Sequence, residues 1–231
     1  MDLCDCGVAC DRGWRSSLGR VVRGIIFDLD NCLAAADEPG AALYDAAFAA
    51  MRAENRGRLS ERELEAAFAD MWRHPLDWVA ERHGFSPEMR TAGWKEFLKT
   101  EVTAPMRGYG DLEELSRLNV KKFLVTSGFR RLQESKIRAL GLNRWMDECH
   151  VDAIDESDRR FKRGWFEDIV GRYGLRTDEV AVVGDSPASE LAAGRELGMR
   201  TVQILRKGVE RTANVDAHVR TLGELRGVLD L

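Results

Sequence analysis

The amino-acid sequence predicts an α/β fold, a doubly wound parallel sheet with an inserted small helical domain. Strand and helix patterns alternate from residue 111 onward, and this alternation is typical of a parallel sheet with helices on both faces. Before it, residues 41–100 show helical patterns only and separate the first strand, at 21–27, from the rest. At ~150 residues per domain, a chain of 231 residues has room for one sizeable domain and a smaller insertion.

The first strand and the helical block are predicted from local patterns. Residues 21–27 are mostly apolar and rich in β-branched side chains, as in a strand buried on both faces. Apolar residues recur three and four positions apart from Ala42 to Met51, which predicts a helix. Ser60 and Glu63 form a capping box that opens a second helix. Prolines and a glycine punctuate further short helices up to residue 100.

The alternating part of the chain begins after Pro105. Three of its predicted helices end at a glycine, Gly141, Gly174 or Gly198, which closes a helix because glycine adopts the left-handed conformation readily. We predict helices at 111–118, 132–140, 165–173 and 190–197, and strands at 122–126, 151–153, 179–184 and 200–204.

Charge and hydropathy exclude two classes of partner. Lys and Arg number 35 against 39 Asp and Glu, for a net charge of −4, so the chain lacks the basic surface that nucleic-acid binding needs. Charged residues interrupt every apolar run well short of a membrane span, and no apolar segment of signal-peptide length opens the chain. We expect a cytoplasmic protein that binds neither nucleic acid nor membranes.

Residues 1–20 show no clear period and hold three cysteines, Cys4, Cys6 and Cys10. These thiols form either a metal site or part of a tail with reduced cysteines. Tetrahedral zinc needs a fourth ligand, and the nearest histidine is His74. The sequence therefore favours a tail, with the role of the three cysteines left open.

Polar residues follow three of the predicted strands, directly where each strand ends. They are Asp28 and Asp30, then Thr126, Ser127 and Gly128, and finally Gly184, Asp185 and Ser186. Because parallel strands end at one edge of a sheet, these groups should meet there. Converging carboxylates repel one another, and Mg²⁺ relieves that repulsion where a phosphate completes its coordination. Hydroxyls and free amides at a strand-to-helix junction suit the phosphate, so the sequence predicts a magnesium-dependent phosphoryl-transfer site.

These segments resemble the motifs of the haloacid dehalogenase superfamily of hydrolases, in its phosphatase branch with a helical cap. The motifs are Asp28-Leu29-Asp30, Thr126-Ser127-Gly128, Lys162, and Gly184-Asp185-Ser186 with Glu190. The resemblance implies a Rossmann-like core domain at 21–33 and 105–231, a helical cap at 34–104 and an N-terminal tail at 1–20.

The resemblance also implies a role for each motif residue. Asp28 is the nucleophile that forms an aspartyl-phosphate, and Asp30 is the general acid and base. Asp28, the backbone carbonyl of Asp30, and Asp185 hold Mg²⁺, and Glu190 orients that metal site. The substrate phosphate is bound by Asn31, Thr126, Ser127, Gly128 and Lys162. The predicted function is a Mg²⁺-dependent phosphatase that hydrolyses a small phosphorylated metabolite.

Several alternatives stay open at this point. A phosphomutase or phosphotransferase uses the same nucleophile, and a non-catalytic binding protein keeps the same fold. The dehalogenating branch is disfavoured because its members generally lack a second aspartate such as Asp30. Arg160 competes with Lys162 as the cation that faces the phosphate. Cys32 stands where the family usually has Thr or Val, and we expect it to serve in packing.

The helical block is expected to close over the site, exclude water and select the substrate. Within it, Trp72, Arg73, His74 and Trp78 are the candidates for substrate contact, although aromatic residues at helical spacing more often fill a core. Phe129 and Arg130, directly after the second motif, are further candidates.

Overall fold

The computed structural model describes residues 21–231, so the tail and its three cysteines lie outside the described residues. Six strands of the described part form one sheet in the order β3-β2-β1-β4-β5-β6, and every neighbouring pair is parallel. The strands are β1 (Gly24–Phe27), β2 (Lys121–Gly128), β3 (Glu148–Ala153), β4 (Val180–Gly184), β5 (Arg200–Ile204) and β6 (Ala217–Val219). The predicted α/β class is confirmed. Because β1 lies between β2 and β4, the switch point of the sheet falls at the carboxyl ends of β1 and β4.

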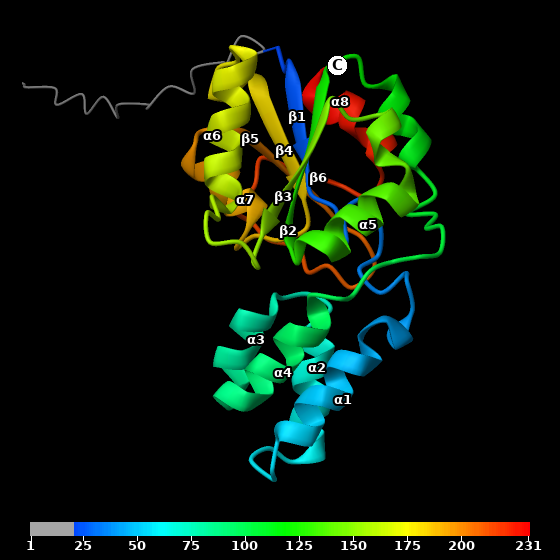
Figure 1. Cartoon of the computed structure of the whole chain (residues 1–231). Helices are drawn as coiled ribbons and strands as arrows, with labels where there is room; N and C mark the ends of the chain where they lie inside the picture. Colours follow the sequence, from blue (N-terminus) through cyan, green and yellow to red (C-terminus); the bar gives the residue numbers. More distant parts are fainter. Residues whose placement is uncertain (1–20) are drawn as a thin grey trace, which may run out of the picture.

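Helices cover both faces of this sheet (Figure 1). On one face lie α5 (Arg130–Leu140) and α8 (Leu225–Leu229), and on the other α6 (Phe161–Tyr173) and α7 (Glu190–Glu196). Side chains of a strand point alternately to the two faces. Accordingly Ile25 and Phe27 pack into the core that includes α5 and α8, whereas Ile26 packs against α6 and α7.

The helical block forms a second core beside the carboxyl edge of the sheet, and Phe129 and Leu132 at the start of α5 also pack into it (Figure 1). It contains the 3₁₀ helix η1 (Ala41–Tyr44) and helices α1 (Asp45–Glu54), α2 (Glu61–Asp70), α3 (Leu76–His83) and α4 (Pro87–Phe97). The predicted capping box is present, because Ser60 Oγ accepts from the Glu63 backbone and Glu63 Oε2 accepts from the Ser60 backbone. Helices α1 and α4 approach closely, so a Cβ on Gly93 would lie 2.6 Å from the sulfur of Met51.

Some elements differ from their predicted form. The segment predicted as a helix at 111–118 is the 3₁₀ helix η2 (Leu112–Arg117), and the short strand β6 was not predicted. Helix α6 begins at Phe161, four residues before the predicted start, which places Lys162 in its first turn. Short 3₁₀ helices η3 (Leu142–Arg144), η4 (Thr177–Glu179) and η5 (Leu222–Glu224) occupy connections. Every helix between residues 21 and 231 is too short or too polar to cross a bilayer.

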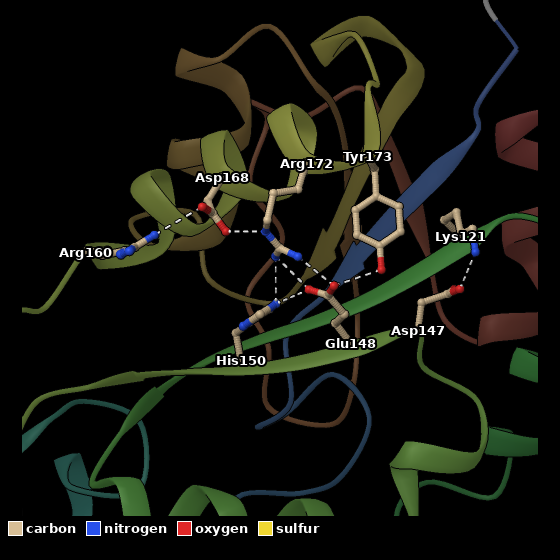
Figure 2. A network of polar contacts seen from close by, with 8 residues as sticks. All are labelled: Lys121, Asp147, Glu148, His150, Arg160, Asp168, Arg172 and Tyr173. Atoms are coloured by element: carbon tan, nitrogen blue, oxygen red, sulfur yellow. Dashed lines mark hydrogen bonds and ion pairs between the residues drawn. The ribbon is translucent and has the colours of Figure 1, made fainter.

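A polar network joins the far end of α6 to strand β3 (Figure 2). The guanidinium of Arg172 donates to both carboxylate oxygens of Glu148, at 2.7 Å each, and the Tyr173 hydroxyl donates to the same carboxylate at 2.9 Å. A bidentate pair of this kind is geometrically specific. The network therefore fixes α6 on the sheet, and with it the first turn that carries Lys162.

This network predicts a loss of stability in acid. Hydrogen bonds from Arg172 hold the pKa of Glu148 at about 2, below its ordinary value of 4.5. A carboxyl with a depressed pKa stabilises the fold above its ordinary pKa and loses that contribution as the pH falls through the folded value. We expect Glu148→Gln to melt lower than the parent near neutral pH, with the gap closing as the pH falls from 4.5 toward 2. Thermal denaturation at a series of pH values measures this difference in Tm, and Glu113→Gln, at an exposed position, is the control. A gap independent of pH would contradict this assignment.

Candidate active site

The two strands at the switch point place the first carboxylates of the site. Asp28 directly follows β1, and its backbone N–H donates to the Val183 carbonyl of β4 at 2.9 Å. This bond extends the pairing of the two strands by one residue and fixes Asp28, whose side chain is buried. Asp185 follows β4 in the same way. The predicted convergence of strand-end carboxylates at one edge is thus present.

Lys162 reaches this edge from the first turn of α6. Its Nζ lies 2.7 Å from Asp28 Oδ1 and 2.7 Å from Glu190 Oε2, and all three side chains are buried. Burial alone would lower the pKa of Lys162, but the two carboxylates outweigh it and raise that pKa. Arg160 points elsewhere: it pairs with Asp168 at 3.2 Å and is about half exposed. This geometry favours Lys162 over Arg160 as the cation of the site.

Glu190 is held at both of its oxygens. Lys162 contacts Oε2, and the backbone N–H of Ser186 donates to Oε1 at 2.6 Å. A Cβ on Gly184 would lie 2.2 Å from Glu190 Oε1, so this close packing requires glycine at the end of β4. The spacing of Gly184, Ser186 and Glu190 in the sequence therefore has a packing reason.

Ligand oxygens of Asp28, Asp185 and Glu190 lie within 4.8 Å of one another. Burial is the largest cause that raises the pKa of both aspartates, and the nearby Glu190 carboxylate raises both further. Carboxylates that disfavour each other's ionisation are stabilised by a bound cation. Oxygen donors of this type are the ligands that Mg²⁺ prefers, so the donor set fits the predicted metal ion.

The side chain of Asp30 turns toward α5 instead of joining this cluster. Its Oδ1 accepts from Lys136 Nζ at 2.7 Å, and its Oδ2 accepts from Gln133 Nε2 at 3.1 Å. Lys136 is only 1% exposed. Taken together, the site then holds four carboxylates and two ammonium groups, so two negative charges are in excess when all six groups are ionised. The groups are Asp28, Asp30, Asp185 and Glu190, and Lys136 and Lys162. A divalent cation balances that excess.

Sequence reasoning missed Lys136 and Gln133, although one signal was available. Lys136 lies four residues after Leu132 and four before Leu140, so it falls on the apolar stripe of its helix. A lysine at such a position is buried and needs a partner. That pattern alone predicts an acidic residue opposite this face of α5.

The second motif lies at the end of β2. Thr126 is buried and faces the same cavity as Asp28. Ser127 Oγ donates to Asp152 Oδ2 at 3.0 Å, and a Cβ on Gly128 would lie 2.6 Å from Gln133 Nε2. Asn31 adopts the left-handed conformation, with φ of 57°, and also lines the cavity. The residues predicted to bind a phosphate are therefore gathered around one space.

This cavity has a volume of about 850 Å³ and lies between the sheet edge and the helical block. The block contributes Trp72, Arg73, His74 and Trp78 to its lining. Trp72 is partly packed, since it stacks on Tyr44 at 4.2 Å, whereas Trp78 is 42% exposed. Arg73 crosses to the sheet domain and donates to the Gly208 carbonyl at 3.0 Å. All four residues thus line the same cavity as Asp28.

The remaining candidates serve in packing or in ion pairs. Phe129 is buried, lines the cavity and stacks on Phe97 at 5.3 Å. Arg130 pairs with Glu134 and Glu156. Cys32 is fully buried beside the Val183 carbonyl, and burial raises the pKa of its thiol well above the usual range. Cys32 therefore fills the core under the site, as its small side chain predicts.

Fold and site together define an enzyme with an acidic centre at the switch point of a doubly wound sheet. Residues 22–198 match the family model of the haloacid dehalogenase-like hydrolases. The chain belongs to this family.

Named relatives agree with this membership. The chain is 26% identical over 221 residues to glyceraldehyde 3-phosphate phosphatase of Methanocaldococcus jannaschii. This match covers 89% of the chain and 96% of that protein. It is 27% identical over 146 residues to an enolase-phosphatase of Aquifex aeolicus, over 60% of this chain and 64% of that one. A phosphatase structure of the same family from Thermococcus onnurineus superposes with a TM-score of 0.60 at 23% identity, over 90% and 98% of the two chains. The predicted enzyme class, a hydrolase acting on phosphoric monoesters, is confirmed at this level.

Proposed function

We propose that the protein is a Mg²⁺-dependent phosphatase that hydrolyses a small phosphorylated metabolite through an aspartyl-phosphate at Asp28. The observation that carries the proposal is the contact of Lys162 with Asp28 and Glu190 beside Asp185, at the switch point of the sheet. Two phosphatase-named relatives support the same chemistry. We further propose that residues 34–104 act as the cap over this site and that residues 21–33 and 105–231 form its core.

The first half-reaction transfers the phosphoryl group to the protein. An oxygen of the Asp28 carboxylate attacks phosphorus while the bond from phosphorus to the leaving oxygen breaks. Asp30 gives its proton to that leaving oxygen. Lys162 and the hydroxyl of Thr126 contact the phosphoryl oxygens, with Lys162 offsetting their negative charge.

The second half-reaction restores the protein. Water attacks the phosphorus of the aspartyl-phosphate and gives its proton to Asp30, and the bond from phosphorus to the Asp28 oxygen breaks. Inorganic phosphate leaves, and Asp28 is again a carboxylate. Mg²⁺, when held by Asp28, Asp185 and the Asp30 carbonyl, supplies charge neutralisation for the phosphoryl group. Glu190 keeps Lys162 in place beside Asp28.

A substrate panel tests this function. Purified protein is incubated with phosphorylated metabolites such as triose, sugar and alcohol phosphates, once with Mg²⁺ and once with EDTA, and released phosphate is measured. We expect release from at least one small phosphomonoester with Mg²⁺ and loss of release with EDTA. Full activity in EDTA would refute the metal dependence. Mg²⁺ binding without release of phosphate from any ester would favour a binding protein that keeps the fold.

The volume and lining of the cavity limit the substrate to a small molecule. About 850 Å³ is within the range of small-molecule sites. Polar groups that bind phosphate lie at the sheet edge, while Trp72 and Trp78 line the opposite, helical side. The substrate is therefore expected to bind with its phosphate on Asp28 and its remaining part against the helical block.

A further inference from the structure

Lys136 carries a buried positive charge on the apolar stripe of α5, at the wall of the cavity that Asp30 also lines. It is 1% exposed, and its helix neighbours Leu132 and Leu140, one turn away on either side, belong to the hydrophobic cores. An ammonium group in such a place is costly unless it is paired. Its carboxylate partner is Asp30, with Nζ and Oδ1 2.7 Å apart. The buried charge of Lys136 therefore lies next to Asp30, the residue to which the proposed function assigns proton transfer.

Gln133 contacts the same carboxylate from one turn earlier on α5. Residues three apart lie on one face of a helix, and Gln133 Nε2 donates to Asp30 Oδ2 at 3.1 Å and to the Ser127 carbonyl at 3.3 Å. The absence of a side chain at Gly128 leaves room for this amide. Gln133 thus ties Asp30 to the end of β2, where the phosphate-binding residues lie.

The two contacts leave the Asp30 carboxylate able to form a further hydrogen bond with a substrate. A carboxylate accepts about four hydrogen bonds, and each oxygen of Asp30 uses one of them here. The side chain is 23% exposed and lines the cavity, so a free acceptor position faces the substrate space. A general acid or base must lie within hydrogen-bond reach of its proton partner, and a side chain held at both oxygens has one orientation instead of several.

We propose that Lys136 and Gln133 are positioning residues that fix the Asp30 carboxylate for proton transfer to and from the substrate. This inference rests on the proposed function, since it presumes that Asp30 is the acid and base. Neither residue donates its proton to the substrate. They act through Asp30, so their loss has the same kinetic signature as the loss of Asp30 itself.

The test compares an alkyl phosphate with 4-nitrophenyl phosphate. Lys136→Met keeps the length of the side chain and removes the charge. We expect it to lower kcat/KM for the alkyl phosphate by about a hundredfold, at the lower end of what acid–base catalysis contributes. We expect at most about a tenfold loss for the aryl phosphate, because its weakly basic leaving group needs little protonation. The loss should lie in kcat, and Gln133→Leu should show a smaller loss with the same selectivity.

A double-mutant cycle separates positioning from a purely structural role. In the Asp30→Asn background, Lys136 has no carboxylate left to position. We therefore expect Lys136→Met to lower kcat/KM for the alkyl phosphate by less than about a further threefold. Lys122→Met is the control for removal of a lysine, because the partly buried Lys122 donates to two backbone carbonyls, of Leu118 and Val120, outside the cavity. That control should not change the ratio of the two substrates.

Three results would overturn the inference while leaving the proposed function intact. The first is equal loss for both substrates in Lys136→Met with a matching fall in Tm. The second is a full, multiplicative loss in the double variant. The third is selective loss in Asp30→Asn but none in Lys136→Met. If the parent protein hydrolyses neither these two esters nor any phosphorylated metabolite of the panel, the proposed function itself fails and this inference fails with it.

Discussion

Asp28→Asn is expected to lower kcat for phosphomonoesters by about 10⁴-fold or more, as the loss of a covalent nucleophile does in other enzymes. An amide is a far weaker nucleophile toward phosphorus than a carboxylate, and the cluster with Asp185 also loses one charged oxygen ligand. The fold should persist, since Lys162 keeps its contact with Glu190. Steady-state phosphate release measures kcat, and thermal melting of the same preparation measures Tm.

Asp230→Asn is a suitable control for this change. Asp230 is 77% exposed, and it adopts a left-handed conformation that asparagine tolerates well. It should leave both kcat and Tm within error of the parent. Turnover by Asp28→Asn within a few-fold of the parent would show that another group attacks phosphorus.

Asp30→Asn is expected to reveal proton transfer through its dependence on the leaving group. We expect kcat/KM for an alkyl phosphate to fall by about 10²–10⁴-fold, the usual contribution of a general acid or base. The loss for an aryl phosphate should be smaller, because its leaving group departs without a proton. Mg²⁺ affinity should be largely retained, since the side chain of Asp30 contacts α5 and only its backbone carbonyl is assigned to the metal.

A structural role for Asp30 predicts a different outcome. Equal losses of kcat/KM for both substrates would follow. A lower Tm is expected under either role, because the buried Lys136 loses its carboxylate partner in both cases. Isothermal titration with Mg²⁺ and kinetics with both esters distinguish these cases. Matched losses together with a collapse of Mg²⁺ affinity would show that Asp30 is not the acid and base.

Much of the fold was predictable because its signals are local. The strand at 200–204 has the predicted bounds, and Gly141 and Gly174 end their helices in the left-handed conformation as expected. The start of α6 was not predictable from periodicity, because its first turn serves the site and not the core: Lys162 contacts Asp28. The 3₁₀ form of η2 depends on tertiary contacts of Leu112 and Leu115 that spacing does not reveal.

Part of the candidate site was likewise predictable from the sequence, and part was not. Asp28 and Asp185 follow buried strands, so their convergence follows from the topology of a parallel sheet. The choice between Lys162 and Arg160 depends on which side chain points inward, and only the structure supplies that direction. The contact of Lys136 with Asp30 joins residues 106 positions apart. No motif spacing encodes it, although the apolar position of Lys136 on its helix marks the residue as unusual.

Direct detection of the phosphorylated protein tests whether Asp28 is the nucleophile. The Asp30→Asn variant is mixed with Mg²⁺ and an aryl phosphate, quenched in acid within the first turnovers and analysed by peptide mass spectrometry. Because Asp30 no longer activates water for the second half-reaction, the proposed mechanism predicts one acid-stable, base-labile phosphoryl group on the peptide that contains Asp28, and none in the Asp28→Asn/Asp30→Asn double variant. A phosphoryl group on another residue, or rapid phosphate release with no phosphorylated protein at any time, would contradict it.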